Sequence, residues 1–371
     1  MRLRVKVPLA RSPYEVLAGD GLLSECGPVI REACPRANAC AVIADSVVAP
    51  LYADAVAASL RGAGITPHVL VFPSGEASKS MACAAGLLDR MIAAGLDRTS
   101  CTAALGGGVT GDLAGFVSAI FYRGIPYFGL PTTLLAQVDS SVGGKTGVNA
   151  PGGKNLIGAF HQPVGVIADT STLSSLPPRE FNEGFAEIIK HGLIRDAALV
   201  ADSHAFSRSR DPAALARLVA RNIEIKAAIV AADEFETTGL RALLNFGHTV
   251  GHAVEQAAGY GRFLHGEAIS IGIAAALRLS VKLAGLDPAA ESAALAALAA
   301  FGLPVRLPAD LSDAALLAAL GRDKKFDRGA IRFVLCPEPG RAFVSKDVAL
   351  ADITAALAEI RETHPEPGIE A

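Results

Sequence analysis

The first half of the chain alternates short β-branched segments with longer helical segments, and this alternation restricts the possible fold more than any other feature. Strands that alternate with helices are typical of a mostly parallel sheet with helices on both faces. We therefore predict a Rossmann-like α/β domain in this half. The expected strands span residues 39–45, 67–72, 100–105, 127–130 and 165–169, and the helices between the first three span 53–61 and 82–94.

The pattern becomes mainly helical after about residue 175. One strand is expected at 330–335, with 341–344 as its candidate partner. A chain of 371 residues is long enough for two cores. We predict an α/β domain over residues 1–175 and a mainly α-helical domain over 176–371. The expected helices span 180–194, 211–232, 241–258, 266–284, 288–301 and 311–320.

Composition excludes several classes of protein. The sequence has no uninterrupted run of the roughly 18 apolar residues that a membrane span needs. The N-terminus has strand periodicity rather than the apolar centre of a signal peptide. The net charge of −3, mixed along the chain and with no Trp, argues against a nucleic-acid surface. The six cysteines show no CxxC spacing, which is typical of reduced thiols in a cytoplasmic protein.

A glycine-rich turn follows the expected third strand. Gly106-x-Gly108-x-x-Gly111 fits the dinucleotide fingerprint and lies between a strand and a helix. Glycines there permit a tight turn and let backbone N–H groups approach a pyrophosphate. In many chains such a pattern is only a turn, but its position here favours a dinucleotide site. The acid that would contact the ribose is then Asp45, upstream of the turn.

A second glycine-rich segment, residues 139–155, carries two lysines, Lys145 and Lys154, and two asparagines, Asn149 and Asn155. Such groups on loops suit a phosphorylated, hydroxyl-rich ligand, which we favour over two solvated surface loops. The segment resembles the end of a P-loop, but Asp139 stands where the first glycine of that motif belongs. We therefore reject an ATPase interpretation.

Three histidines, His248, His252 and His265, fall within 18 residues. His-x-x-x-His places two imidazoles on one helical face, where they could serve one metal ion or form a hydrogen-bonded pair in a core. Arg241 and Asn245 lie one to two turns earlier, so the expected helix 241–258 would have a polar face, and that favours a site over packing.

Glu187 and Lys190 are three residues apart, which places them on one face of a helix. This spacing is most often a surface ion pair. Alternatively, Glu187 could be a metal ligand, with Lys190 facing a substrate.

Together these segments resemble 3-dehydroquinate synthase, a family of the sugar phosphate cyclase superfamily. The resemblance runs from about residue 40 to 345, in order and with spacing close to that of the family. The matching segments are 73–80, 106–113, 122–124, 131–146, 153–163, 176–180, 186–190, 244–248, 265–267 and 323–325. Residues 237–238, Thr-Thr, stand where the family has one residue, so the register that links Lys226 and Glu236 to Arg241 is less certain.

The resemblance implies an NAD-binding α/β domain, a helical domain and a site in the cleft between them. It also implies zinc or cobalt bound by Glu187, His248 and His265, with His252 left to relay a proton. Arg123 would reach across the interface of a homodimer. The other residues expected to bind substrate or act in catalysis are Asn155, Asp139, Lys190, Lys226, Arg241, Asn245 and one of Lys324 or Lys325. The residues expected to contact NAD, besides Asp45, are Glu76, Lys79, Gly107, Gly108, Val109, Asp112, Thr132, Thr133, Lys145, Lys154, Thr172 and Ser175.

The implied reaction converts the phosphorylated keto acid DAHP into 3-dehydroquinate with release of phosphate, through a transient oxidation by NAD. A related cyclase that makes an inosose or valiolone is one alternative. A metal-dependent polyol dehydrogenase of the glycerol type is another, and it would consume NAD stoichiometrically. A nucleotide-binding regulatory protein is a third alternative, and it would need no metal ligands.

Overall fold

The computed structural model describes residues 2–259, 261–321, 326–327 and 330–362. It divides into two compact units, the first formed by residues 1–181 and 211–235 and the second by 182–210 and 236–371. The units are therefore not continuous segments of the chain, and the domain ranges 1–175 and 176–371 stay a prediction. Lys324 and Lys325 lie outside the described residues.

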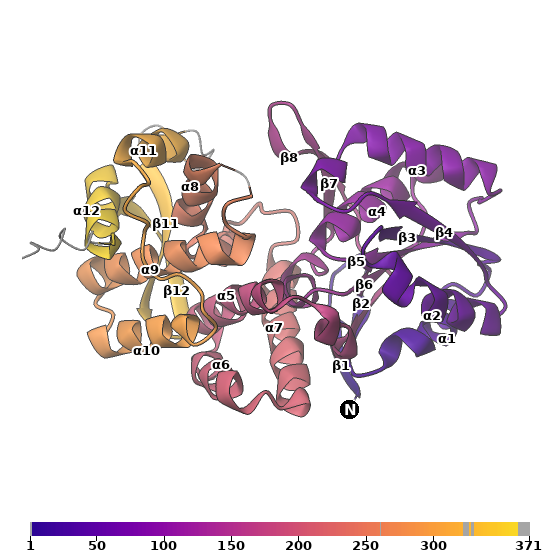
Figure 1. Cartoon of the computed structure of the whole chain (residues 1–371), viewed down its shortest axis with the longest axis horizontal. Helices are drawn as coiled ribbons and strands as arrows, with labels where there is room; N and C mark the ends of the chain where they lie inside the picture. The colour runs from indigo at the N-terminus through magenta and orange to yellow at the C-terminus, as the bar shows by residue number, and fades with distance from the viewer. Residues whose placement is uncertain (1, 260, 322–325, 328–329, 363–371) are drawn as a thin grey trace, which may run out of the picture. The chain divides into compact units, whose positions relative to one another are not determined.

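A seven-stranded sheet forms the centre of unit 1 (Figure 1). Every neighbouring pair is parallel except β1 and β2, which pair antiparallel, so the predicted mostly parallel sheet is confirmed. In spatial order the strands are β1 (Arg2–Val7), β2 (Tyr14–Gly19), β9 (Gly165–Asp169), β6 (Tyr127–Pro131), β5 (Cys101–Gly106), β3 (Ala39–Asp45) and β4 (Thr66–Phe72).

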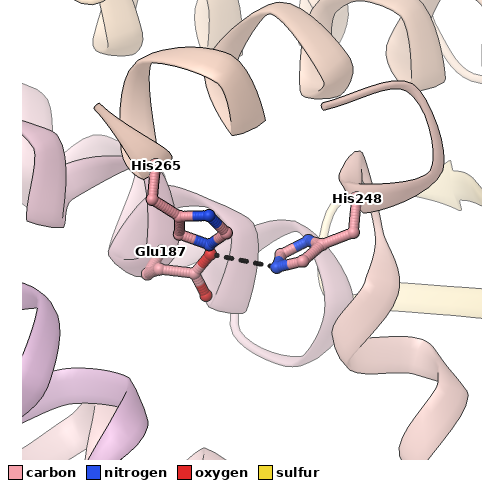
Figure 2. Close-up of side chains that lie close together, drawn as sticks. All are labelled: Glu187, His248 and His265. Atoms are coloured by element: carbon pink, nitrogen blue, oxygen red, sulfur yellow. Dashed lines mark ion pairs between the residues drawn. The ribbon is translucent and has the colours of Figure 1, made fainter. Parts of the chain in front are cut away.

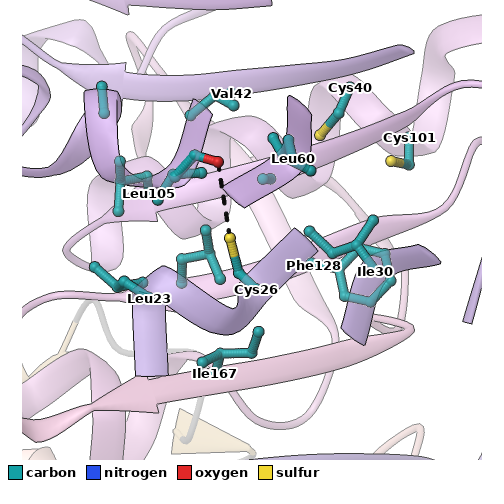
Figure 3. Packing of buried hydrophobic residues seen from close by; sticks show 14 of the residues in the cluster. Leu23, Cys26, Ile30, Cys40, Val42, Leu60, Cys101, Leu105, Phe128 and Ile167 are labelled. Atoms are coloured by element: carbon teal, nitrogen blue, oxygen red, sulfur yellow. Dashed lines mark hydrogen bonds between the residues drawn. The ribbon is translucent and has the colours of Figure 1, made fainter. Parts of the chain in front are cut away.

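Helices cover both faces of this sheet. Side chains along each strand alternate between the two sides, so neighbouring residues of one strand pack in different clusters. Val42 of β3 packs in a cluster with residues of α1 (Cys26–Ala33) and α2 (Ala49–Gly62), part of which Figure 3 shows. Its neighbour Ile43 belongs to the opposite cluster, with residues of α3 (Met81–Ala93) and α4 (Gly108–Ile120). The continuous apolar strands thus follow from burial on both sides.

The strand order reverses between β3 and β5. From β3 the chain passes to β4 on one side, and it then continues from β5 to β6 on the other. In open α/β sheets, ligands bind at such a switch point, outside the carboxyl ends of the strands. Asp45 ends β3 and Gly106 ends β5 at this point. The predicted position of the glycine-rich turn, between a strand and a helix, is confirmed.

The basic segment expected to form loops is instead a β-hairpin of β7 (Lys145–Ala150) and β8 (Gly153–Phe160). Gly and Asn are depleted in strands, so the local composition pointed to loops. The strands approach so closely that a Cβ on Gly158 would lie 2.2 Å from the carbonyl oxygen of Thr146. Glycine is therefore required by the pairing itself.

Unit 2 is mainly helical, as predicted, with α12 (Leu350–Ile360) and a three-stranded sheet of β10 (Phe326–Asp327), β11 (Ala330–Glu338) and β12 (Arg341–Val348). The predicted pairing of 330–335 with 341–344 is confirmed by β11 and β12. The other helices of unit 2 are most of α5 (Pro178–Arg195), α6 (Ala198–Ser209), α8 (His248–Ala258), α9 (His265–Ala284), α10 (Pro288–Ala299) and α11 (Asp313–Gly321).

The predicted continuous helix 241–258 is wrong. A 3₁₀ segment, η6 (Leu240–Asn245), ends before Phe246, and Gly247 has φ of 79° before α8 begins at His248. Glycine adopts this left-handed conformation readily, whereas other residues do not. Arg241 and Asn245 therefore do not share one helical face with His248 and His252.

One helix predicted in the second half, 211–232, belongs to unit 1 as α7 (Pro212–Ala232), where it contacts β1. Asp211 caps its N-terminus, since its carboxylate accepts hydrogen bonds from the N–H groups of Ala213 and Ala214. Among the described residues no helix is both long enough and apolar enough to span a membrane.

Candidate metal centre and cofactor-binding residues

Glu187, His248 and His265 come together in unit 2 (Figure 2). Each offers one ligand atom, and the three atoms lie within 4.8 Å of one another. One carboxylate and two imidazoles form a donor set of the kind that holds a catalytic zinc ion with one position left open. The residues come from three helices: Glu187 from α5, His248 from the first position of α8 and His265 from the first position of α9.

Glycines allow these three helices to meet. A Cβ on Gly272 of α9 would lie 2.0 Å from the carbonyl oxygen of Gly247, just before α8. A Cβ on Gly266 would lie 2.1 Å from the carbonyl oxygen of Glu183, one turn before Glu187 on α5. The Gly266 N–H also donates to the Glu183 carboxylate at 3.0 Å. The backbone contacts of α9 thus fix where His265 begins that helix.

Glu187 and Lys190 form an ion pair, but both side chains are fully buried rather than at the surface. The Lys190 ammonium contacts Oε2 of Glu187. The second oxygen, Oε1, is buried without a hydrogen bond among the described residues and lies 3.5 Å from Nε2 of His248. A buried carboxylate oxygen is costly to leave unsatisfied, so a cation facing Oε1 fits this site.

His265 also belongs to a second group, with His252 and Glu255. Nδ1 of His265 lies 3.5 Å from Oε1 of Glu255, while its ring faces Glu187 in Figure 2. Burial lowers the pKa of His265, but the hydrogen bond and charge of Glu255, with the charges of Glu187 and Glu183, outweigh it and raise the pKa. His252 is exposed, which suits proton exchange better than tight metal binding. The Glu187 group is therefore the better candidate for a metal centre.

Other predicted residues of unit 2 are close to this group along the chain. Arg241 is buried, and its Nε lies 3.5 Å from Oε1 of Glu236, so the two residues whose register was uncertain form an ion pair. Asn245 ends η6, three residues before His248. The ring centroids of His248 and His252 are 5.3 Å apart, edge to face.

The glycine-rich turn in unit 1 borders a small, partly open recess of about 20 Å³. Gly107 and Gly108 lie where α4 begins, so the first N–H groups of a 13-residue helix face this region. Oγ1 of Thr132, just after β6, is buried without a hydrogen bond among the described residues. An unpartnered hydroxyl beside a helix N-terminus suits an anionic, hydroxyl-rich cofactor. The recess is lined by Ala104, Gly106, Gly107, Gly111, Asp112, Tyr127, Gly129, Leu130, Pro131, Ala136, Ser140, Ser141 and Lys145.

Lys79 and Asp112 form an ion pair of 2.5 Å in unit 1, with Lys79 buried. Burial raises the pKa of Asp112, although the charge and hydrogen bond of Lys79 oppose this. Asp45, expected to contact a ribose, is also buried, and its oxygens accept hydrogen bonds from the N–H groups of Val47 and Val48 and from the Thr110 hydroxyl at 3.3 Å. It therefore orders the switch point itself.

The remaining predicted residues of unit 1 include one ion pair, and most of the others are exposed or half-buried. Lys226 of α7 donates to Oδ1 of Asp139 at 2.6 Å and to its backbone carbonyl at 2.5 Å. Arg123 is exposed with φ of 69°, at the end of η3 (Phe121–Arg123). Exposed or half-buried positions hold Glu76, Val109, Thr133, Lys145, Lys154, Asn155 and Ser175, while Thr172 is buried.

Sequence reasoning assigned no role to two residues, Glu255 and Tyr52. Glu255 lies three residues after His252, a helical spacing that could have marked it. Tyr52 donates to the carbonyl of Thr172 and the hydroxyl of Ser175, over 120 residues along the chain, which no local pattern indicates.

Comparison with known proteins agrees with these features. The N-terminal family model of 3-dehydroquinate synthase matches residues 69–183 and the C-terminal model matches 184–326. A 3-dehydroquinate synthase from Caulobacter vibrioides is 48% identical over 364 residues, which cover 96% of this chain and 98% of that protein.

Solved structures show the same architecture. A 2-deoxy-scyllo-inosose synthase complexed with carbaglucose-6-phosphate, NAD+ and Co2+ has a TM-score of 0.87 at 27% identity, covering 96% of this chain and 100% of that one. The 2-epi-5-epi-valiolone synthase of Streptomyces hygroscopicus, with NAD+ and Zn2+ bound, has a TM-score of 0.85 at 30% identity, covering 95% and 98%. A probable glycerol dehydrogenase from Sinorhizobium meliloti, at 18% identity and a TM-score of 0.60 over 93% and 97%, shares the fold alone.

The glycine-rich turn, the Glu–His–His group and these likenesses define a sugar phosphate cyclase. Within that superfamily, the two adjoining family models and the full-length sequence identity show which family the chain belongs to. The chain belongs to the 3-dehydroquinate synthase family, lyase-type cyclases of the shikimate pathway.

Proposed function

We propose that this chain converts DAHP into 3-dehydroquinate and phosphate, using NAD+ catalytically and a divalent zinc or cobalt ion held by Glu187, His248 and His265. The observation that carries the proposal is Oε1 of Glu187, which is buried, has no hydrogen bond within the part of the chain that the structure describes, and lies 3.5 Å from Nε2 of His248. When bound, NAD+ and the ion would supply transient oxidation of a secondary alcohol and polarisation of its oxygen.

The chain's own residues support the proton and charge steps. An exposed imidazole on the face next to His248, that of His252, can accept the proton of the alcohol at a ring nitrogen and return it. Lys190, held by Glu187, and the buried Arg241 supply fixed positive charge for phosphate and carboxylate groups.

In unit 1, we propose that the N-terminus of α4 and the hydroxyl of Thr132 bind NAD+, with Lys79 held by Asp112 beside them. Asp45, Glu76, Val109, Thr133, Lys145, Lys154, Thr172 and Ser175 stay the other proposed NAD contacts. Asp139, Lys226, Arg123 and Asn155 stay proposed for substrate.

The test is to incubate purified, metal-replete protein with DAHP and a catalytic amount of NAD+ and follow phosphate release with and without a chelator. We expect phosphate release that the chelator abolishes, with no net NADH. Steady accumulation of NADH without phosphate release would instead favour a polyol dehydrogenase. Turnover of a hexose phosphate in preference to DAHP would favour one of the cyclases that make an inosose or valiolone.

We also propose that the enzyme acts in the cytoplasm as a homodimer. Six free cysteines support a reducing compartment. Exposure of Arg123 on a left-handed backbone supports a role for its side chain outside its own subunit.

A further inference from the structure

Asn149 lies where the ladder between β7 and β8 is interrupted. The register of the hairpin shifts between Val148 and Ala150, which frees the backbone of Asn149 from β8. Its N–H donates instead to the carbonyl of Lys79 at 2.8 Å. Bulges of this kind redirect a side chain and are common beside active sites. The segment that carries Lys79 is thereby tied to the hairpin.

The carboxamide of Asn149 makes two further bonds, in opposite senses. Nδ2 donates to Oε1 of Glu76 at 2.8 Å. Oδ1 accepts from the backbone N–H of Asn155 at 2.9 Å. Asn155 has φ of 57°, so this bond holds a residue in the left-handed region at the start of β8.

We propose that Asn149 is a positioning residue that holds Glu76 and Asn155 at a fixed separation, so that the NAD-binding and substrate-binding groups of unit 1 are set together. This rests on the proposed function, which assigns Glu76 to NAD+ and Asn155 to substrate. A carboxamide donates to a carboxylate through its nitrogen and accepts from an N–H through its oxygen at the same time. Aspartate would set a second carboxylate against Glu76, and alanine would lose both bonds.

The exposure of Asn149 and its two partners argues against a role of Asn149 in stability alone. Glu76 and Asn155 are exposed and Asn149 is only half-buried, and hydrogen bonds at such positions add little to folding. The observable effect of Asn149 should therefore appear in ligand binding.

The experiment measures NAD+ affinity by isothermal titration calorimetry, KM for DAHP at saturating NAD+ and the melting temperature, all on the full chain. Asn149→Ala should raise both the dissociation constant for NAD+ and the KM about 3- to 10-fold, the loss of one hydrogen bond. Asn149→Asp should weaken NAD+ binding further. The melting temperature should change by no more than about 2 °C.

Thr146→Val is the matched control. It removes a hydrogen bond of the same hairpin, from the Thr146 hydroxyl to the carbonyl of Ala159, and keeps the side-chain volume. We expect NAD+ affinity within about twofold of the wild type, because Thr146 takes no part in the hydrogen bonds of Asn149 with Glu76 and Asn155. Equal losses in Thr146→Val and Asn149→Ala would mean that hairpin integrity alone matters, which overturns the inference.

A double-mutant cycle separates positioning from structure. In a Glu76→Ala background, Asn149→Ala should no longer weaken NAD+ binding but should still raise KM for DAHP. An undiminished effect on NAD+ in that background, or unchanged affinity in the single variant, overturns the inference and leaves the proposed function standing. A wild-type chain that binds no NAD+ overturns both.

Discussion

Gly272 of α9 lies so close to Gly247 that a Cβ on Gly272 would fall 2.0 Å from the Gly247 carbonyl oxygen. Backbone atoms cannot move aside as a flexible side chain can. The contact brings the helix that begins at His265 against the helix that begins at His248. The geometry of the proposed metal centre therefore depends on a residue that offers no ligand atom.

Gly272→Ala should destabilise the protein by about 3 kcal/mol and weaken zinc binding, because the two helices must separate. Urea unfolding and zinc titration would measure the two effects. Gly86→Ala in α3 is the control, since its Cβ would meet nothing within 4 Å. That variant should be neutral or stabilising by about 0.5–1 kcal/mol. A Gly272→Ala protein with wild-type stability would show that the contact is not as tight as described.

His252→Ala should keep its metal and lose its rate, whereas His265→Ala should lose both. The reason is that His265, which is half-buried, belongs to one group with the buried Glu187, while His252 is exposed beside that group. Metal content of the purified variants and phosphate release from DAHP would distinguish the two. If His252→Ala lost its metal and His265→Ala retained it, the group of His252, Glu255 and His265 would be the metal centre instead.

Glu255→Gln should lower zinc affinity about tenfold. The Glu255 carboxylate faces Nδ1 of His265 at 3.5 Å, and a carboxylate at the far nitrogen of a metal-binding histidine orients the ring. Competition with a chelator of known affinity measures the change. Glu359→Gln serves as control, since Glu359 of α12 pairs with Lys282 and Arg278 in the second half of α9, more than three turns from His265. Equal affinities in the two variants would remove Glu255 from the site.

Stability should fall as the pH is lowered from about 6.5, in part through His161. Burial lowers its pKa below the ordinary 6.5, although the hydrogen bond with the carbonyl of Ile125 opposes this. The unfolded chain therefore binds a proton at higher pH than the folded chain. The stabilisation is complete above 6.5 and is lost as the pH falls through the lower folded pKa.

His161→Phe keeps a ring that can stack on Tyr127, which His161 contacts at 5.3 Å between centroids, but removes the titration. Urea unfolding between pH 5 and 7.5 should then show a shallower dependence on pH. A slope identical to that of the wild type would mean that His161 contributes nothing to it.

The inner strands of unit 1, β3, β5, β6 and β9, could be predicted because they are mostly apolar and buried on both faces. The interruption of the predicted helix 241–258 at Gly247 could not be predicted. Polar residues at 241, 245, 248 and 252 have helical spacing, and a single glycine within such a pattern is usually tolerated. The left-handed φ becomes necessary only because α9 packs there.

The candidate site, like the fold, could be predicted from the sequence only in part. Residue spacing alone suggested His248 and His252 as the metal pair, and the family resemblance replaced His252 with Glu187 and His265. The structure brings the second set together. No local pattern could have indicated it, because 61 positions separate Glu187 from His248 and the contact depends on glycines in other helices.

The placement of α7 has a consequence for how this protein can be divided. Residues 211–235 complete unit 1, where α7 covers β1, yet they are synthesised after part of unit 2. A fragment that stops at residue 181 would leave one face of the first strand without its partner helix. Neither unit can be produced as an uninterrupted piece of the natural chain, so we expect neither to fold from a single contiguous fragment.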